Sequence, residues 1–212
     1  MYAVPDLDAA IEWAADIFDS RPALGGAHRG RGTRNALLSL GSTYLEIIAP
    51  DPAQQLEGNL GAAFANLTQG GLVTWAAQGD LDSTAQILSN AGISCRGPSQ
   101  TERQDPQGQL LIWKLLFAQS NVYGARLPFF IDWLACEHPS QTNPLGGEFQ
   151  SLEISTPDSS EYKSLLQSLG MNSERLNIDV CEGEPALTLK IACRRGEVTL
   201  QSTQQTTLLK MA

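Results

Sequence analysis

The chain has 212 residues, of which 42% are hydrophobic, and this is enough for a packed core in one large domain or two small ones. Its net charge of -9 and its scattered basic residues argue against nucleic acid or an anionic membrane as a partner, and no apolar run approaches the roughly 18 residues of a membrane span. Because Met1 is followed by no secretory leader and the four cysteines form no Cys-x-x-Cys pair, we expect a cytoplasmic protein with reduced cysteines.

The first predicted unit covers residues 1–50. Pro5 and Asp6 end a short apolar strand and open an amphipathic helix, which Arg21-Pro22 stops. The glycine-rich residues 25–32 are interpreted as a loop. Strands are then expected at residues 33–40 and 44–49, joined by a tight turn at Gly41-Ser42.

The same order of elements is expected twice more. A helical segment at residues 53–70 leads to the second unit, residues 71–135, and residues 139–147 separate it from a third unit, residues 148–212. The expected elements of these two units are a strand at 72–77, a helix at 82–91, a short strand at 93–95, a turn at 105–108, strands at 110–117 and 127–134, a strand at 150–155, a helix at 160–169, and strands at 175–180, 186–193 and 197–201.

This repetition predicts an α+β protein built from βαβββ units. Two units enclose a cavity in a half-open mixed β-barrel within a domain of residues 1–138, and the third unit is attached through residues 139–147. An odd number of units leaves one sheet face without its usual cover. We therefore expect the third unit to pack against the first two or to form a homodimer interface.

Four segments carry a resemblance to a known family. They are residues 2–10 (YAVPDLDAA), 32–41 (GTRNALLSLG), 44–50 (YLEIIAP), and 128–133 (PFFIDW) with His138-Pro139. In this order they resemble the glyoxalase-like domain family of the vicinal oxygen chelate superfamily, which includes glyoxalase I, extradiol dioxygenases and antibiotic-resistance binding proteins. The resemblance covers residues 1 to about 140 and says little about the substrate.

The resemblance also implies a metal site. Metal-dependent members use a His on the first strand and a Glu on the fourth strand of a unit, and Glu46 matches the Glu position. The matching His would lie about three residues before Tyr2, upstream of Met1, so the chain as printed is expected to lack it. A divalent ion such as Zn, Mn, Fe or Ni is therefore expected only if Glu46 finds other partners.

Strand alternation gives the candidate site residues. It places Glu46 opposite in direction to Leu45 and Ile47, and a buried carboxylate of this kind requires a metal, an arginine or water, with Arg34 as a structural alternative. His28 is a second catalytic candidate, against the simpler interpretation of a loop histidine that only forms hydrogen bonds. The candidate ligand-binding residues are Arg34 with the neighbouring basic loop at the cavity mouth, Asn35 and Ser39 on one strand face, and Trp113, although a tryptophan in such a strand is more often a core residue than a ligand platform.

Two functions follow from these residues. One is a metal-free protein that binds a small, partly apolar ligand in the cavity, and the expected absence of the first-strand His favours it. The alternative is a metal-dependent lyase, isomerase or dioxygenase, in which a metal held by Glu46 chelates two adjacent substrate oxygens.

Overall fold

The computed structural model of the chain describes residues 1–104, 108, 110–171 and 176–209. The strands are β1 (Tyr2–Ala3), β2 (Ala23–His28), β3 (Thr33–Ser39), β4 (Tyr44–Pro50), β5 (Gly71–Leu72), β6 (Ala76–Gln78), β7 (Ser94–Gln104), β8 (Leu110–Gln119), β9 (Phe129–Asp132), β10 (Glu148–Thr156), β11 (Ile178–Glu182), β12 (Ala186–Cys193) and β13 (Gly196–Gln201). The helices are α1 (Leu7–Phe18), α2 (Leu60–Ala65), α3 (Leu81–Asn90), α4 (Pro139–Thr142), α5 (Ser159–Ser168) and α7 (Gln204–Thr207), with a 3₁₀ turn, η1, at Gly124–Arg126. None of the helices within these described residues has the length and apolar character needed to cross a membrane.

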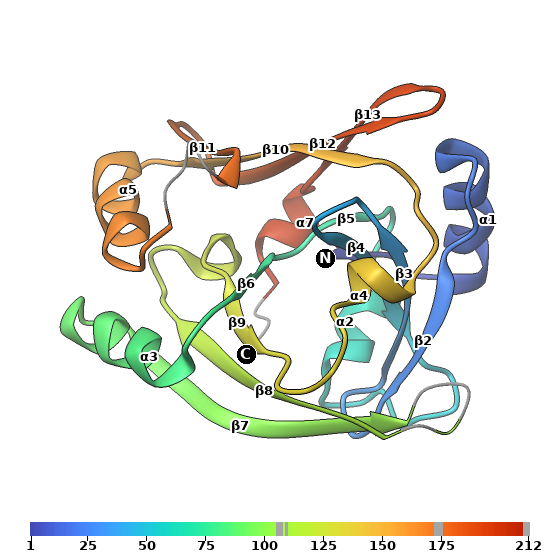
Figure 1. Cartoon of the computed structure of the whole chain (residues 1–212), viewed down its shortest axis with the longest axis horizontal. Helices are drawn as coiled ribbons and strands as arrows, with labels where there is room; N and C mark the ends of the chain where they lie inside the picture. The colour runs from blue at the N-terminus through green and yellow to red at the C-terminus, as the bar shows by residue number, and fades with distance from the viewer. Residues whose placement is uncertain (105–107, 109, 172–175, 210–212) are drawn as a thin grey trace.

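The strands form three sheets of four or five strands each, so the protein has a mixed α+β fold (Figure 1). Sheet A has the order β2-β3-β4-β1-β5 and sheet B the order β6-β9-β8-β7. In both sheets the first strand of a unit runs parallel to the last strand of the same unit: β1 pairs with β4, and β6 pairs with β9. A helix connects the first strand to the remaining strands in each case, as a parallel crossover requires.

Sheet C, formed by the third unit, has a different strand order. The chain again supplies a strand, a helix and three strands, but the sheet order is β11-β10-β12-β13. The first strand, β10, lies parallel to β11 and antiparallel to β12, so it occupies an inner position. The expected order of elements along the chain is therefore present in the third unit, while the sheet order of the first two is not repeated.

Three sequence predictions about the elements differ from the structure. Residues 23–28 form strand β2, although the glycines favoured a loop, because β2 is an edge strand and Gly25 allows Asn35 and Arg103 to approach it closely. The strand expected at residues 72–77 divides into β5, which pairs in sheet A, and β6, which pairs in sheet B. Strand β7 extends well beyond the short strand expected at residues 93–95. Residues 105–107 of the predicted turn and residue 175 of a predicted strand lie outside the described residues.

Helix α1 forms where its N-terminal signal predicts. The Asp6 carboxylate accepts hydrogen bonds from the backbone N–H groups of Asp8 and Ala9, which caps the helix. The side chains at helical spacing are buried against sheet A, namely Leu7, Ala10, Ile11, Ala14 and Phe18. The helix ends at Asp19, which adopts a left-handed conformation with φ of 53°.

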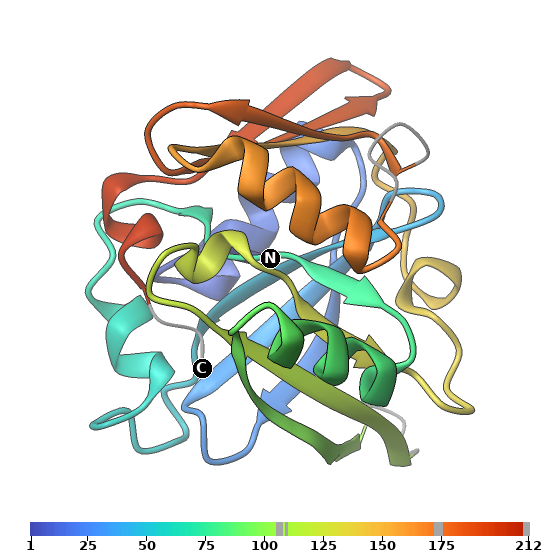
Figure 2. The same ribbon diagram turned by 90° about the vertical axis from the view of Figure 1, so that its left-hand side faces the viewer.

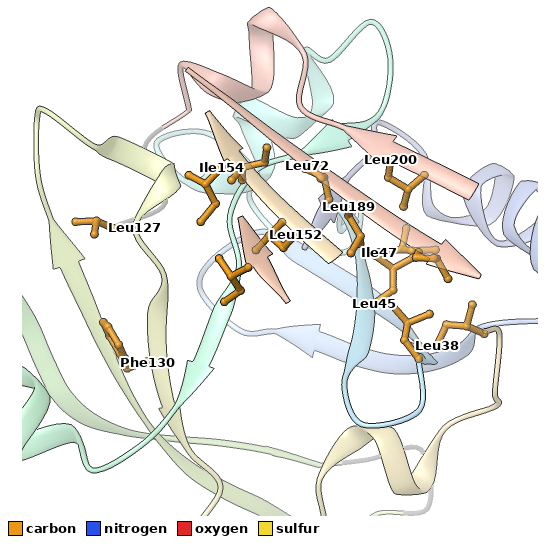
Figure 3. Close-up of a cluster of buried hydrophobic side chains, with 14 of the residues drawn as sticks. Leu38, Leu45, Ile47, Leu72, Leu127, Phe130, Leu152, Ile154, Leu189 and Leu200 are labelled. Atoms are coloured by element: carbon orange, nitrogen blue, oxygen red, sulfur yellow. The ribbon is translucent and has the colours of Figure 1, made fainter. Parts of the chain in front are cut away.

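One hydrophobic cluster joins all three units (Figure 3). It contains Leu45 and Ile47 from β4, Phe130 from β9 and Leu189 from β12. Sheet C and α1 thus share a core with one face of sheet A. Helices α3 and α5 lie on the same side of the molecule (Figures 1 and 2). The expectation that the third unit packs against the first two is confirmed, whereas a homodimer stays a prediction.

Candidate functional site

A cavity of about 970 Å³ lies between the faces of sheets A and B that point away from this core. Strand alternation decides which residues reach it. Sheet A contributes Thr33, Asn35 and Leu37 from β3 and Tyr44, Glu46 and Ile48 from β4; sheet B contributes Trp113, Leu115 and Phe117 from β8. The intervening residues Leu45 and Ile47 belong to the core, as predicted.

Glu46 forms the centre of a buried polar network. Its side chain is 11% exposed, and its Oε1 accepts a hydrogen bond of 2.7 Å from Nδ2 of Asn35. The Oδ1 of Asn35 in turn accepts a hydrogen bond of 3.2 Å from Nη1 of Arg103. The network therefore links sheet A to sheet B and connects a buried carboxylate to a guanidinium through one amide.

His28 lies beside this network. Its Nδ1 is 3.0 Å from Oγ1 of Thr33, and its Nε2 is 3.9 Å from Oε1 of Glu46. Burial lowers the pKa of His28 below its usual value, the charge of Glu46 opposes that shift, and the charges of Arg103 and Arg31 add to it. The imidazole is therefore neutral at neutral pH, and it can accept or donate a hydrogen bond in the cavity.

An aromatic wall faces the polar network. Trp113 is 8% exposed and lines the cavity, with the guanidinium of Arg103 5.8 Å from its ring centroid. The ring of Trp113 lies 5.8 Å from that of Trp133, which contacts Tyr44 edge-on at 6.2 Å. The walls are thus largely apolar around a small number of fixed polar groups, as is typical of small-molecule sites.

Four of the six candidate residues come together in the cavity, namely His28, Asn35, Glu46 and Trp113. Arg34 points to the opposite face of sheet A, where its Nη2 lies 3.0 Å from a carboxylate oxygen of Asp8 on α1. Ser39 donates a hydrogen bond of 2.8 Å to the carbonyl of Ser140 and so holds α4. Neither Arg34 nor Ser39 is among the residues that line the cavity.

Sequence reasoning missed Arg103 and gave no role to Tyr44. The sequence does contain a signal for Arg103. A turn predicted at residues 105–108 and followed by an apolar strand implies a second hairpin strand before the turn, and Arg103 lies in that second strand. Tyr44 lies two residues before Glu46 and shares its strand face. Burial and the charge of Glu46 raise the pKa of Tyr44 far above its usual value, so its hydroxyl stays protonated.

The residues present do not fit the divalent metal that the resemblance implies. A catalytic site of that kind typically uses three protein ligands. In the part of the chain that the structure describes, no three His, Cys, Asp or Glu side chains converge on one point. Glu46 accepts a hydrogen bond from the Asn35 amide, and Nε2 of His28 lies 3.9 Å from its Oε1.

Comparisons with known proteins place the fold. A hypothetical protein from Staphylococcus aureus is 17% identical with a TM-score of 0.56, over 85% of this chain and 75% of its own. Methylmalonyl-CoA epimerase from Mycobacterium tuberculosis is 24% identical with a TM-score of 0.47, over 61% of this chain and 82% of its own. No curated protein matches the chain. The family described as "Glyoxalase-like domain" matches residues 1–170, and the chain therefore belongs to the glyoxalase-like domain family.

Proposed function

We propose that the protein binds a small, partly apolar molecule in the cavity between sheets A and B. In this proposal the units of residues 1–50 and 71–135 enclose the ligand as a half-open barrel within a binding domain of residues 1–138. The observation that carries the proposal is the Arg103–Asn35–Glu46 network, buried in a largely apolar cavity of about 970 Å³. That volume lies near the upper end of the range of small-molecule pockets, roughly 300 to 1,000 Å³.

The cavity presents three kinds of polar group to a ligand. Glu46 has a carboxylate that accepts hydrogen bonds, Tyr44 has a hydroxyl that donates them, and Arg103 brings a positive charge. A ligand that places a hydroxyl or amine at Glu46 supplies the partner that a buried carboxylate requires. Its apolar part would pack against Trp113 and Leu115.

The alternative function, a metal-dependent lyase, isomerase or dioxygenase, has no comparable support. It requires a donor set beyond Glu46 and His28, and the described residues do not bring a third ligating side chain to these two.

The binding proposal is tested with N-phenyl-1-naphthylamine, a neutral dye that becomes fluorescent in apolar sites. We expect saturable binding of about one dye per chain, with energy transfer from tryptophan to the dye. Because Trp113 lines the cavity, Trp113→Phe should reduce that transfer. Trp13 packs against Tyr2 and Phe18 outside the cavity lining, so Trp13→Phe is the matched control. Absence of saturation, or an equal loss of transfer in both variants, would contradict the proposal.

A further inference from the structure

Two arginines lie against the ring of Phe117, a residue of the cavity wall; Arg31 also lines the cavity, whereas Arg96 is not itself among the lining residues and contacts the ring of one. The guanidinium carbon of Arg31 is 5.3 Å from the ring centroid of Phe117, and that of Arg96 is 5.0 Å from it. Arg96 pairs with Phe117 across the β7–β8 ladder, and Arg31 reaches the ring from the turn after β2. The ring of Phe117 is itself stacked on Phe129, with 5.7 Å between centroids. The Phe117 ring, against which both arginines pack, is therefore held in position by Phe129.

The two positive charges have no acidic partner among the residues that the structure describes. Within the described residues, no carboxylate lies within 4.0 Å of either Arg31 or Arg96. Burial lowers the pKa of Arg31, and the charge of Arg96 lowers it further. In a chain with a net charge of -9, two adjacent arginines without a counter-ion are an unusual local excess of positive charge. The ring offsets part of their repulsion, and an anion would offset much more of it.

Besides Glu46, two carboxylates of the lining, those of Glu102 and Glu137, lie near the Ile112 end of β8. Glu102 pairs with Ile112 across the ladder, and Glu137 follows Cys136, whose sulfur contacts the backbone of Ile112. The exposed apolar residues of the lining are Leu24, Leu110 and Leu134. Strand β8 spans roughly 20 Å from Leu111 to Phe117, at about 3.3 Å per residue. Lining residues thus extend along β8 from Leu110 to Phe117, with Arg103 beside Trp113 and Arg31 at the Phe117 end.

We propose that Arg31 and Arg96 form an anion subsite at the Phe117 end of the cavity, and that the ligand is an elongated organic anion with an apolar body. This inference rests on the proposed function, because the body of the ligand occupies the same cavity. A carboxylate or a phosphate would lie between the two guanidinium groups, which can each donate two hydrogen bonds to it. Its apolar body would extend along β8, past Trp113.

The test uses two dyes with the same apolar skeleton. The dye 8-anilinonaphthalene-1-sulfonate carries an anionic group, which N-phenyl-1-naphthylamine lacks. We expect the wild-type protein to bind the sulfonate more tightly than the neutral dye. Arg31→Gln/Arg96→Gln should weaken the sulfonate about tenfold or more, since charge-assisted hydrogen bonds are lost, and should leave the neutral dye within about twofold. Arg21→Gln/Lys163→Gln removes the same charge from exposed positions away from the cavity lining and is the control.

The outcomes separate the two proposals. Equal affinities for both dyes, or an equal loss in both double variants, would overturn the anion subsite while leaving cavity binding intact. Failure of the neutral dye to bind would overturn the proposed function itself. Displacement of the sulfonate by dodecanoate or by dodecyl phosphate supports the subsite, and the stronger competitor identifies the headgroup. If neutral dodecanol displaces the sulfonate as strongly as either anion does, the result counts against the anion subsite.

Discussion

At the scale of single residues, Glu46 determines the polar character of the cavity. It accepts a hydrogen bond from Asn35, and its charge acts on both His28 and Tyr44. The pKa of the histidine is lowered and that of the tyrosine is raised, with burial as the main cause of both shifts. At neutral pH the site therefore holds a neutral imidazole and a neutral phenol beside the side chain of Glu46.

Replacing Glu46 should affect binding more than folding. In Glu46→Gln the amide oxygen can still accept the hydrogen bond from Asn35, so we expect the free energy of unfolding to change by no more than about 1 kcal/mol. Binding of a ligand that donates a hydrogen bond to the carboxylate should weaken. Thermal unfolding and dye titration of the same preparation check both expectations.

Leu45→Ala is the comparison variant for Glu46→Gln. Leu45 is the adjacent residue and points into the core, where it is 1% exposed. Its truncation should destabilise the protein by about 2 to 4 kcal/mol through the cavity that it leaves. A Glu46→Gln protein that unfolds as readily as Leu45→Ala would identify Glu46 as a structural anchor and not as a binding group.

The histidines predict a pH dependence of stability. The pKa of His28 and that of His138 are both lowered from 6.5 in the folded chain, mainly by burial. Well above pH 6.5 each imidazole is neutral in both states and contributes nothing to the pH dependence. Below pH 6.5 the unfolded chain binds more protons, so the free energy of unfolding falls as the pH drops below that value. Urea titrations between pH 7.5 and 5 should show this decline.

His28→Asn isolates the contribution of His28 to that decline. Asparagine can replace Nδ1 in the contact with Thr33 but does not titrate. We expect the variant to lose less stability than the wild type between pH 7 and 5, with the contribution of His138 remaining. An unchanged slope would mean that His28 does not titrate differently in the two states.

The donor set of the cavity predicts the metal content of the protein. Glu46 and His28 supply two ligating side chains with 3.9 Å between Oε1 and Nε2, which is fewer than the three of a typical catalytic zinc site. We expect protein purified without chelator to hold well below one equivalent of Zn, Mn, Fe or Ni. Elemental analysis that finds about one tightly held ion per chain would contradict this.

At the scale of elements, Gly25 lies where the edge strand β2 approaches the edge strand β7, and this position leaves no room for a side chain. A Cβ atom on Gly25 would overlap Oδ1 of Asn35 and lie 3.0 Å from Nη1 of Arg103. Gly25→Ala should therefore displace the network, cost about 1 to 3 kcal/mol and weaken dye binding. Gly79→Ala is the control, because its Cβ would meet only Oγ1 of Thr84, at 3.9 Å. Equal effects of the two substitutions would show that Gly25 is not constrained by this contact.

The sequence predicts local features of the site better than its long-range contacts. Alternation along β3 and β4 assigns Asn35 and Glu46 to the cavity, because a period of two depends only on neighbouring residues. Contacts between sheets, such as Arg103 with Asn35, depend on how distant segments pack and have no local pattern. Strand β2 is missed for a related reason, since its glycines are favoured by a tertiary contact and not by strand propensity.

At the scale of the whole molecule, the third unit is held to the rest by its core and by ion pairs. Arg194 and Arg195 both bind the carboxylate of Asp19 at the end of α1, at 2.9 and 3.2 Å. The hydroxyl of Tyr162 on α5 donates a hydrogen bond of 2.5 Å to the carbonyl of Arg126. Since one hydrophobic cluster spans all three units, we expect them to unfold together.

Ile191 tests this cooperativity. It lies on β12 in sheet C and is fully buried, so Ile191→Ala should cost about 2 to 5 kcal/mol. We expect circular dichroism and release of the cavity dye to shift to the same lower temperature. Leu208→Ala, at a side chain that is 76% exposed, should change the free energy of unfolding by no more than about 0.5 kcal/mol. Dye release that stays at the wild-type temperature in Ile191→Ala would show that sheet C unfolds independently.

Sheet A separates the core from the cavity, and this has a consequence for how the protein can change over evolution. Along β4, Tyr44, Glu46 and Ile48 face the cavity, and the alternate residues Leu45 and Ile47 face the core. Alternate residues of one strand thus determine which ligand binds and whether the chain folds. A lineage that carries this sheet can exchange the cavity-facing residues one at a time and acquire new ligands, while the residues between them keep the protein folded.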